Sequence, residues 1–196
     1  MAARGAGRLR LASESQRTPL VPNGVMGMLI FVATETMLFA GMISAFTIIK
    51  SSSLVWPPPD QPRLPVGQTA INTAALLLSG VALWFAQRSF ARGADRARKP
   101  LLAAMLLGAF FVVFQGVEWV ALIRQGLTLT SSNLGAFFYL IVGLHALHAV
   151  IALGILAYTW VRLQRGWLAQ RQLAAAQVFW YFVVGLWPVL YAVVYL

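Results

Sequence analysis

The two histidines of the chain, His145 and His148, lie three residues apart in the stretch Gly-Leu-His-Ala-Leu-His-Ala at 143–149. This stretch lies deep inside an apolar run over 134–161. Residues at this spacing share one face of a helix, and an imidazole can carry a proton, form hydrogen bonds or bind a metal. In lipid, such a group faces protein rather than hydrocarbon. The sequence therefore predicts a central helix toward which the other polar groups point.

Two acidic residues inside other apolar runs are candidate partners for these histidines. An ionised Glu35 would cost about 3 kcal/mol at its depth in a membrane, and Glu118 shares a helix face with Gln115, three residues earlier. At about 1.5 Å per residue, Glu35 can reach the layer of His148. Likewise, Gln115 and Glu118 can approach the layer of His145. We predict that these five side chains form an intramembrane polar cluster. Two interpretations of Glu35 remain open. It is a carboxylate that takes part in proton transfer or binds a partner, or it is a hydrogen-bonded carboxyl that fixes helix packing.

These residues do not by themselves make a redox centre. Glu35 and Glu118 could complete a metal site of two imidazoles and two carboxylates, but a bis-histidine haem takes ligands from opposite sides, and His145 and His148 share one face. The chain has no cysteine, which removes thiolate nucleophiles, iron–sulfur clusters and thiolate copper sites. We therefore expect no catalytic residue, metal or cofactor on this chain.

Membrane helices must position these groups. The 196 residues are 60% hydrophobic and only 10% charged, and apolar runs of at least 18 residues indicate transmembrane helices. There are five such runs, at 25–49, 66–86, 101–123, 134–161 and 173–196. We predict an all-α membrane protein with a five-transmembrane-helix bundle over 25–196, preceded by a basic cytoplasmic N-terminal arm over 1–24.

The basic residues are distributed unevenly along this predicted topology. With five spans, the N-terminal arm and the second and fourth connections share one side of the membrane, and they carry all the basic residues except Lys50, Arg63 and Arg124. Because basic residues favour the cytoplasmic side, the N-terminus is predicted inside and the C-terminus outside. The net charge of +10 is thus explained by topology and lipid headgroup contact, without nucleic acid.

Several further residues have the chemistry of helix-packing contacts. Small, hydroxylated and amide side chains let membrane helices approach and bond to one another, and indole and phenol groups add further donors. We assign a packing or partner-facing role to six residues: Asn72, Ser79, Trp119, Trp180, Tyr181 and Trp187.

Five motifs in order resemble subunit III of the haem–copper respiratory oxidases, the cytochrome c oxidase subunit 3 family. They are Thr-Glu-Thr-Met-Leu-Phe-Ala-Gly at 34–41, Asn-Thr-x4-Leu-Ser-Gly at 72–80, Gln-x-x-Glu-Trp at 115–119, Gly-Leu-His-x-x-His at 143–148 and Phe-Trp-x-Phe-x4-Trp at 179–187. The resemblance covers 24–196, which is nearly all of the membrane part. Glu35 matches the buried carboxylate of the family, and the pairs Gln115/Glu118 and His145/His148 match two of its motifs.

This resemblance implies an accessory, non-redox subunit of a bacterial aa3- or caa3-like cytochrome c oxidase. Such a subunit packs on the catalytic subunit I, with subunit II in the same complex, while haem and copper lie in those partners. It holds phospholipid and supports proton uptake and durability during aerobic electron transport in the plasma membrane. The family usually has seven helices, so the absence of the first two affects its lipid cleft. The chain also has Tyr181 and Val184 where the family commonly has histidine and aspartate.

Two alternatives remain open. Related subunits accompany nitric oxide reductases and quinol oxidases, although the glutamate at position 35 favours the cytochrome c branch, since those relatives more often have aspartate there. From another class, a small proton-coupled transporter would place a substrate site around Glu35 and would work without a partner.

Overall fold

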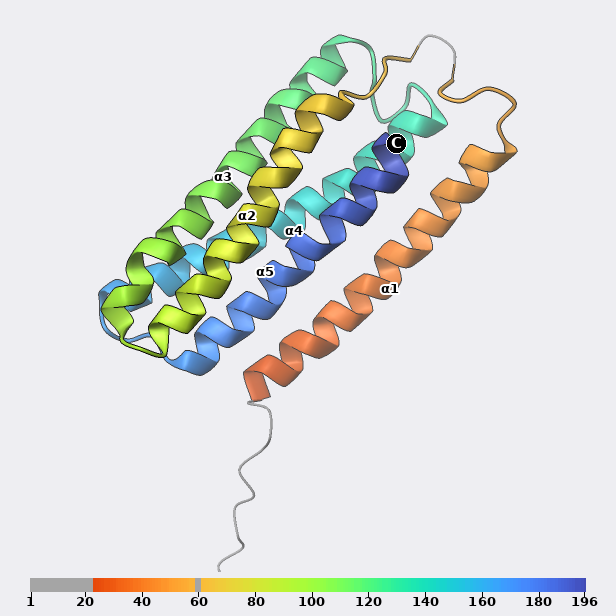
Figure 1. The fold of residues 1–196 in the computed structure, drawn as a ribbon. Helices are drawn as coiled ribbons and strands as arrows, with labels where there is room; N and C mark the ends of the chain where they lie inside the picture. Colours follow the sequence, from red (N-terminus) through yellow and green to blue (C-terminus); the bar gives the residue numbers. More distant parts are fainter. Residues whose placement is uncertain (1–22, 59–60) are drawn as a thin grey trace, which may run out of the picture.

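The fold is seen in a computed structural model that describes residues 23–58 and 61–196. This part of the chain forms five long helices and no strand (Figure 1). The helices are α1 (Asn23–Ser52), α2 (Val66–Phe90), α3 (Ala94–Arg124), α4 (Asn133–Gln164) and α5 (Gln170–Leu190), and a π-helical turn, η1 (Tyr191–Tyr195), continues α5. All five are long and apolar enough to cross a membrane, which confirms the predicted five-span all-α bundle. Nearly all of the predicted arm over 1–24 lies outside the described residues.

The helices are not packed equally. α2 and α3 form a close antiparallel hairpin, and α4 and α5 lie against it (Figure 1). α1 lies on the far side of α5 and contacts only α4 and α5 extensively among the helices (Figure 1). The bundle therefore consists of a four-helix body with α1 attached at one edge.

The buried side chains of α4 form a single stripe along the helix, which we call its seam. Its buried side chains alternate at intervals of three and four residues, which is the spacing that keeps one stripe of a helix facing its neighbours. His145 and His148 occupy two consecutive positions of this seam, between Ile141 and Ala152. The backbone periodicity that buries the apolar residues of α4 thus also places both imidazoles inside the bundle.

The seam of α1 is narrower. Its fully buried side chains are Phe39 and Phe46, and Glu35 precedes Phe39 by four residues on the same stripe. Many large apolar side chains elsewhere on α1 are exposed, including Ile30, Met37 and Ile48. One stripe of α1 therefore makes its contact with the body, and the rest faces lipid or a partner.

The connection between α2 and α3 is shorter than predicted. The apolar runs at 66–86 and 101–123 leave residues 87–100 between the second and third predicted spans, whereas the structure has only residues 91–93 between the two helices. The charges of this segment mark the edge of the membrane, but arginine and alanine are good helix formers, so both helices continue into water. Gly93, with φ of +144°, reverses the chain, and Asp95 pairs with Arg98 at 2.8 Å on the surface.

A close approach at Gly108 joins α3 to α5. A β-carbon at this position would lie 2.5 Å from Cη2 of Trp180, well inside van der Waals contact. Trp180 is fully buried, and its indole N–H donates to the Ser79 hydroxyl at 3.1 Å, so the ring has little freedom to move away.

We expect Gly108→Ala to destabilise the bundle by about 1–3 kcal/mol, the usual cost of overpacking a filled core. Gly154→Ala is the matched control, because the same substitution in α4 meets no atom within 4 Å. The measurement is the free energy of unfolding in a detergent titration. Equal stability of the two variants would contradict the close packing at Gly108.

Candidate functional site

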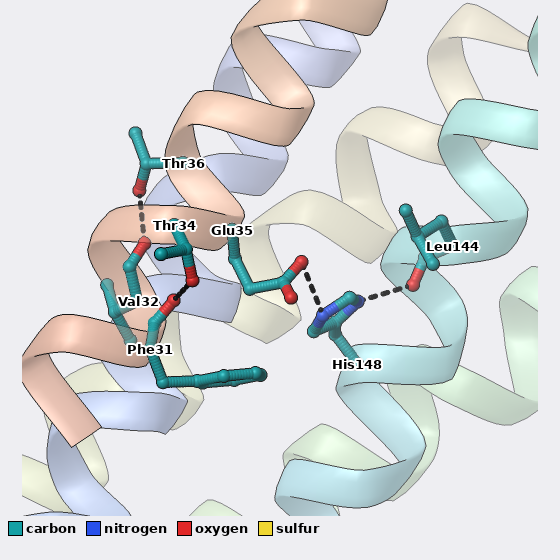
Figure 2. A network of polar contacts seen from close by, with 7 residues as sticks. All are labelled: Phe31, Val32, Thr34, Glu35, Thr36, Leu144 and His148. Atoms are coloured by element: carbon teal, nitrogen blue, oxygen red, sulfur yellow. Dashed lines mark hydrogen bonds and ion pairs between the residues drawn. The ribbon is translucent and has the colours of Figure 1, made fainter. Parts of the chain in front are cut away.

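An ion pair between Glu35 and His148 joins α1 to α4. Glu35 Oε2 lies 3.1 Å from His148 Nε2, and their side chains are 18% and 8% exposed. On the other side of the ring, His148 Nδ1 lies 2.8 Å from the carbonyl oxygen of Leu144 (Figure 2). The imidazole is therefore held at both nitrogens, by a carboxyl from one helix and by the backbone of its own.

The neighbours of the His148 ring limit which of its nitrogens can act as a hydrogen-bond donor. The Leu144 carbonyl only accepts, so His148 Nδ1 carries a hydrogen. Glu35 Oε2 lies within ion-pair distance of Nε2, but the geometry of this contact is not that of a hydrogen bond. A protonated ring facing an ionised carboxyl is an ion pair, and a neutral ring facing a neutral carboxyl is an uncharged pair. An uncharged pair is far cheaper in a membrane interior than either ion alone.

Aromatic rings enclose this pair. The rings of Phe31, Phe39, Phe179 and Phe182 have centroids 5.6–6.4 Å from that of His148. They come from α1 and α5, so the pair lies at the junction of three helices. An electrostatic contact in such an apolar surrounding is stronger than one in water.

The two threonines that flank Glu35 take no part in the pair. The Thr34 hydroxyl donates to the carbonyl of Phe31 at 2.7 Å, and the Thr36 hydroxyl donates to that of Val32 at 2.8 Å (Figure 2). Both bonds stay within α1 and on its exposed side, so they let polar side chains of the Thr-Glu-Thr motif face lipid.

A second network surrounds Glu118. Thr69 donates to the carboxylate at 3.2 Å, and Gln115 Nε2 lies 3.0 Å from its Oε2. Gln115 Nε2 also donates to the Tyr195 hydroxyl at 3.1 Å, while Asn72 Nδ2 contacts the Gln115 side-chain oxygen at 3.4 Å. All five side chains are buried. The network thus ties α2, α3 and the last turn of the chain together.

His145 belongs to neither network. Its ring stacks on that of Trp187 at 5.0 Å between centroids, with Phe39 and Phe111 edge-on against it. Within the described part of the chain, neither ring nitrogen has a hydrogen-bond partner. The five predicted polar side chains are therefore divided into two bonded networks and one imidazole packed among aromatic rings.

The packing residues have unequal roles. Trp180 donates to Ser79, and Trp187 donates to Thr73 at 2.8 Å, so two indoles of α5 bond to hydroxyls of α2. Tyr181 accepts a bond from Gln177 within α5 and is 36% exposed. Trp119 packs edge-on against Tyr139 with ring centroids 5.8 Å apart.

The residues singled out from the sequence leave out Thr69 and Thr73, which share the helix-packing chemistry of their apolar run, and they also leave out Tyr195. The two threonines lie on the same buried stripe of α2 as Asn72 and Ser79, at intervals of three and four residues. This spacing in the sequence could have indicated that they face the other helices. Tyr195 had no such signal, because a π-helical turn at the end of α5 places its hydroxyl beside Gln115.

The described residues do not assemble a metal site. No three side chains of the His, Cys, Asp and Glu types lie close enough together in this part of the chain to hold an ion. In particular, Glu35 and Glu118 lie in separate networks, so the set of two imidazoles and two carboxylates is not brought together.

Comparison with known proteins gives the family. The family model for "Cytochrome c oxidase subunit III" matches residues 11–196. The chain belongs to the cytochrome c oxidase subunit III family. A probable cytochrome c oxidase subunit 3 of Nocardia farcinica is 30% identical over 182 residues, which cover 89% of this chain and 88% of that protein. The cytochrome c oxidase subunit 3 of Rattus norvegicus is 28% identical over 193 residues, covering 93% and 73% respectively.

In this member of the subunit III family, the motifs that carried the resemblance coincide with the contacts between helices. The Thr-Glu-Thr motif supplies the carboxyl of the first pair, and Gln-x-x-Glu supplies the centre of the second network. Of the paired histidines, His148 completes the first pair and His145 stacks on Trp187 of α5. The motifs thus supply polar and aromatic contacts between the helices of a multi-pass membrane protein.

We expect Glu35→Ala to lower the free energy of unfolding by about 1–3 kcal/mol, because His148 Nε2 loses its buried partner. Glu35→Gln should recover part of this loss, since an amide N–H can donate to the neutral ring nitrogen. The measurement is unfolding of the purified chain in a detergent titration.

Thr34→Ala is the control, because the Thr34 hydroxyl bonds only to its own helix. Its expected effect is within about 0.5 kcal/mol. If Glu35→Ala and Thr34→Ala had equal effects, the pair would not hold α1 to the body.

Proposed function

We propose that this chain is an accessory, non-redox subunit of a bacterial aa3- or caa3-like cytochrome c oxidase, which stabilises subunit I during oxygen reduction. Membership of the family makes the chain a subunit of a haem–copper oxidase complex. The main support for an accessory role is the character of the buried polar groups, which bond helix to helix. Haem and copper are then held by the partner subunits, and phospholipid contacts the apolar surface.

The proposed mechanism begins with the attachment of α1. The bond from Glu35 to His148 fixes the depth and rotation of α1 against α4. With this helix fixed, its exposed apolar side chains form a rigid surface against which subunit I can pack, close to subunit II. Rigid, preformed surfaces lose little entropy on association, so they favour a long-lived complex.

The same pair offers a physical basis for supporting proton uptake. A proton placed on the Glu35 carboxyl or on the His148 ring can move from one to the other without changing the net charge of the pair. Groups near a proton entry path can therefore reorient or exchange a proton here at little electrostatic cost.

We further propose that the chain lies in the plasma membrane with its N-terminus cytoplasmic and its C-terminus outside. The ends of the helices on the proposed inner side carry most of the basic residues, and Arg88 lies 3.9 Å over the ring of Trp84. Arginine and tryptophan at one depth are typical of a membrane interface.

The test of the function is purification of a tagged chain in mild detergent from its native membrane, with mass spectrometry and a haem spectrum. We expect subunits I and II of a cytochrome c oxidase to copurify. In the Glu35→Ala complex, the initial rate of oxygen consumption should survive, while the active half-life falls about fivefold, the effect of ~1 kcal/mol. The Thr34→Ala complex should keep the half-life of the natural protein.

Other partners would change the proposal. Nitric oxide reductase subunits or a quinol oxidase would move the accessory role to that complex. A chain that purifies alone, stable and without haem, would favour the small proton-coupled transporter. Immediate and complete loss of haem absorbance in Glu35→Ala would contradict an accessory role.

Orientation can be measured by labelling single cysteines, since the natural chain has none. Leu54, in the connection after α1, and Arg92, in the connection after α2, are both exposed. We expect a membrane-impermeant maleimide to label Leu54→Cys in intact cells and Arg92→Cys only after permeabilisation. The reverse pattern would invert the proposed topology.

A further inference from the structure

Three hydroxyl groups on the buried stripe of α2 contact other helices, and two of them follow one rule. The Ser79 hydroxyl donates to the carbonyl three residues earlier at 2.6 Å, and the Thr73 hydroxyl donates to the carbonyl four residues earlier at 2.7 Å. Each also accepts an indole N–H, from Trp180 at 3.1 Å and from Trp187 at 2.8 Å respectively. Because an indole nitrogen only donates, each hydroxyl gives its one hydrogen to its own helix and receives another from α5.

Thr69 is the third of these hydroxyls, and a carboxyl group stands where the other two have an indole. Thr69 Oγ1 lies 2.9 Å from the carbonyl oxygen of Pro65, four residues earlier, and 3.2 Å from each oxygen of Glu118. A hydroxyl has one hydrogen, so Thr69 cannot donate fully to both neighbours. The Pro65 carbonyl has no hydrogen to give, whereas a carboxyl can carry one. Both contacts are satisfied when Thr69 donates to Pro65 and Glu118 donates to Thr69.

The other surroundings of Glu118 fit the same arrangement. Gln115 Nε2 lies 3.0 Å from Oε2 and donates to it, so Oε1 is the oxygen that remains to carry a hydrogen. Tyr195 of η1, which accepts from Gln115 at 3.1 Å, is a phenol and is neutral at physiological pH. Glu118 is only 4% exposed, and no cation pairs with it among the residues that the structure describes. The neutral acid avoids the cost of an unpaired charge inside the membrane.

We propose that Glu118 is an intramembrane proton-binding site, in which Oε1 holds the proton at neutral pH and donates it to Thr69 Oγ1. The Thr69 hydrogen goes to the Pro65 carbonyl, so a chain of bonds runs from α3 to the beginning of α2. Thr69 lies near the start of α2 and Glu118 in the last two turns of α3, which places the site toward the proposed outer end of the bundle. Water at that end supplies the proton. The site is formed within this chain alone, so it does not depend on assembly with an oxidase.

The test is infrared difference spectroscopy of the full-length chain in detergent at neutral pH. A protonated carboxyl has a carbonyl stretching band that moves in heavy water, and a carboxylate lacks this band. Glu35→Gln is present in both samples, so that the other buried carboxyl contributes to neither. We expect the spectrum of Glu35→Gln minus that of Glu35→Gln/Glu118→Gln to contain the band of a protonated carboxyl. A carboxylate band in its place would overturn the proposal.

A second pair of variants keeps Glu118 in place. In Thr69→Val the carboxyl loses the acceptor of its hydrogen, so its carbonyl band should shift, whereas Thr69→Ser should leave it unchanged. Thr47→Val is the matched control, because the Thr47 hydroxyl bonds only to a carbonyl of its own helix. An unshifted band in Thr69→Val would overturn the assignment of Thr69 as the acceptor.

The direction of the bond also predicts what an amide does at this position. The side chain in Glu118→Gln can donate to Thr69 and accept from Gln115, as the neutral acid does, so the unfolding equilibrium constant should stay within about threefold of that of the natural chain. Thr69→Val leaves the carboxyl hydrogen without an acceptor and should raise this constant about tenfold. The measurement is unfolding in a detergent titration. If Glu118→Gln raised the constant as much as Thr69→Val, the group at 118 would act as a carboxylate and the proposal would fail.

Discussion

Lipid offers no hydrogen-bond partner, and this constraint determines how the bundle is built. Each polar side chain inside a span must bond to its own helix, bond to another helix, or be enclosed by other side chains. The chain uses all three solutions: Thr34 bonds within α1, Glu35 bonds to α4, and His145 is stacked on Trp187. Apolar helix surfaces gain little free energy from association in lipid, because lipid tails are as apolar as the side chains. The polar contacts between helices therefore specify which helices become neighbours.

The two hydrogen-bonded networks connect different parts of the bundle. The network around Glu118 joins α2, α3 and η1, so it belongs to the four-helix body. The pair of Glu35 and His148 joins α1 to that body. Aromatic side chains, including Trp187 and Phe39, fill the space around His145. The two carboxyl groups therefore have separate sets of partners, His148 for Glu35 and Thr69 with Gln115 for Glu118.

Much of this could be predicted from the sequence. The five apolar runs give the helices directly, and depth counting brought Glu35 to His148, because both depend on the regular rise of a helix. Rotation and neighbour choice could not be obtained in this way. Depth alone placed Glu118 near His145, whereas the close hairpin of α2 and α3 turns it toward Thr69. The role of Tyr195 depends on a local π-helical turn, which has no simple sequence pattern.

The narrow attachment of α1 has a consequence for biogenesis. α1 is synthesised before the helices that receive it, so its carboxyl enters the membrane while most of the chain, including His148, has yet to be made. Until α4 is inserted, Glu35 has no imidazole as its partner, and a lone ionised carboxylate in lipid is costly. Insertion of α4 then gives the Glu35 carboxyl its partner, His148. Docking of α1 is thereby a late step, coupled to the arrival of the histidine helix, and its order follows from the order of synthesis.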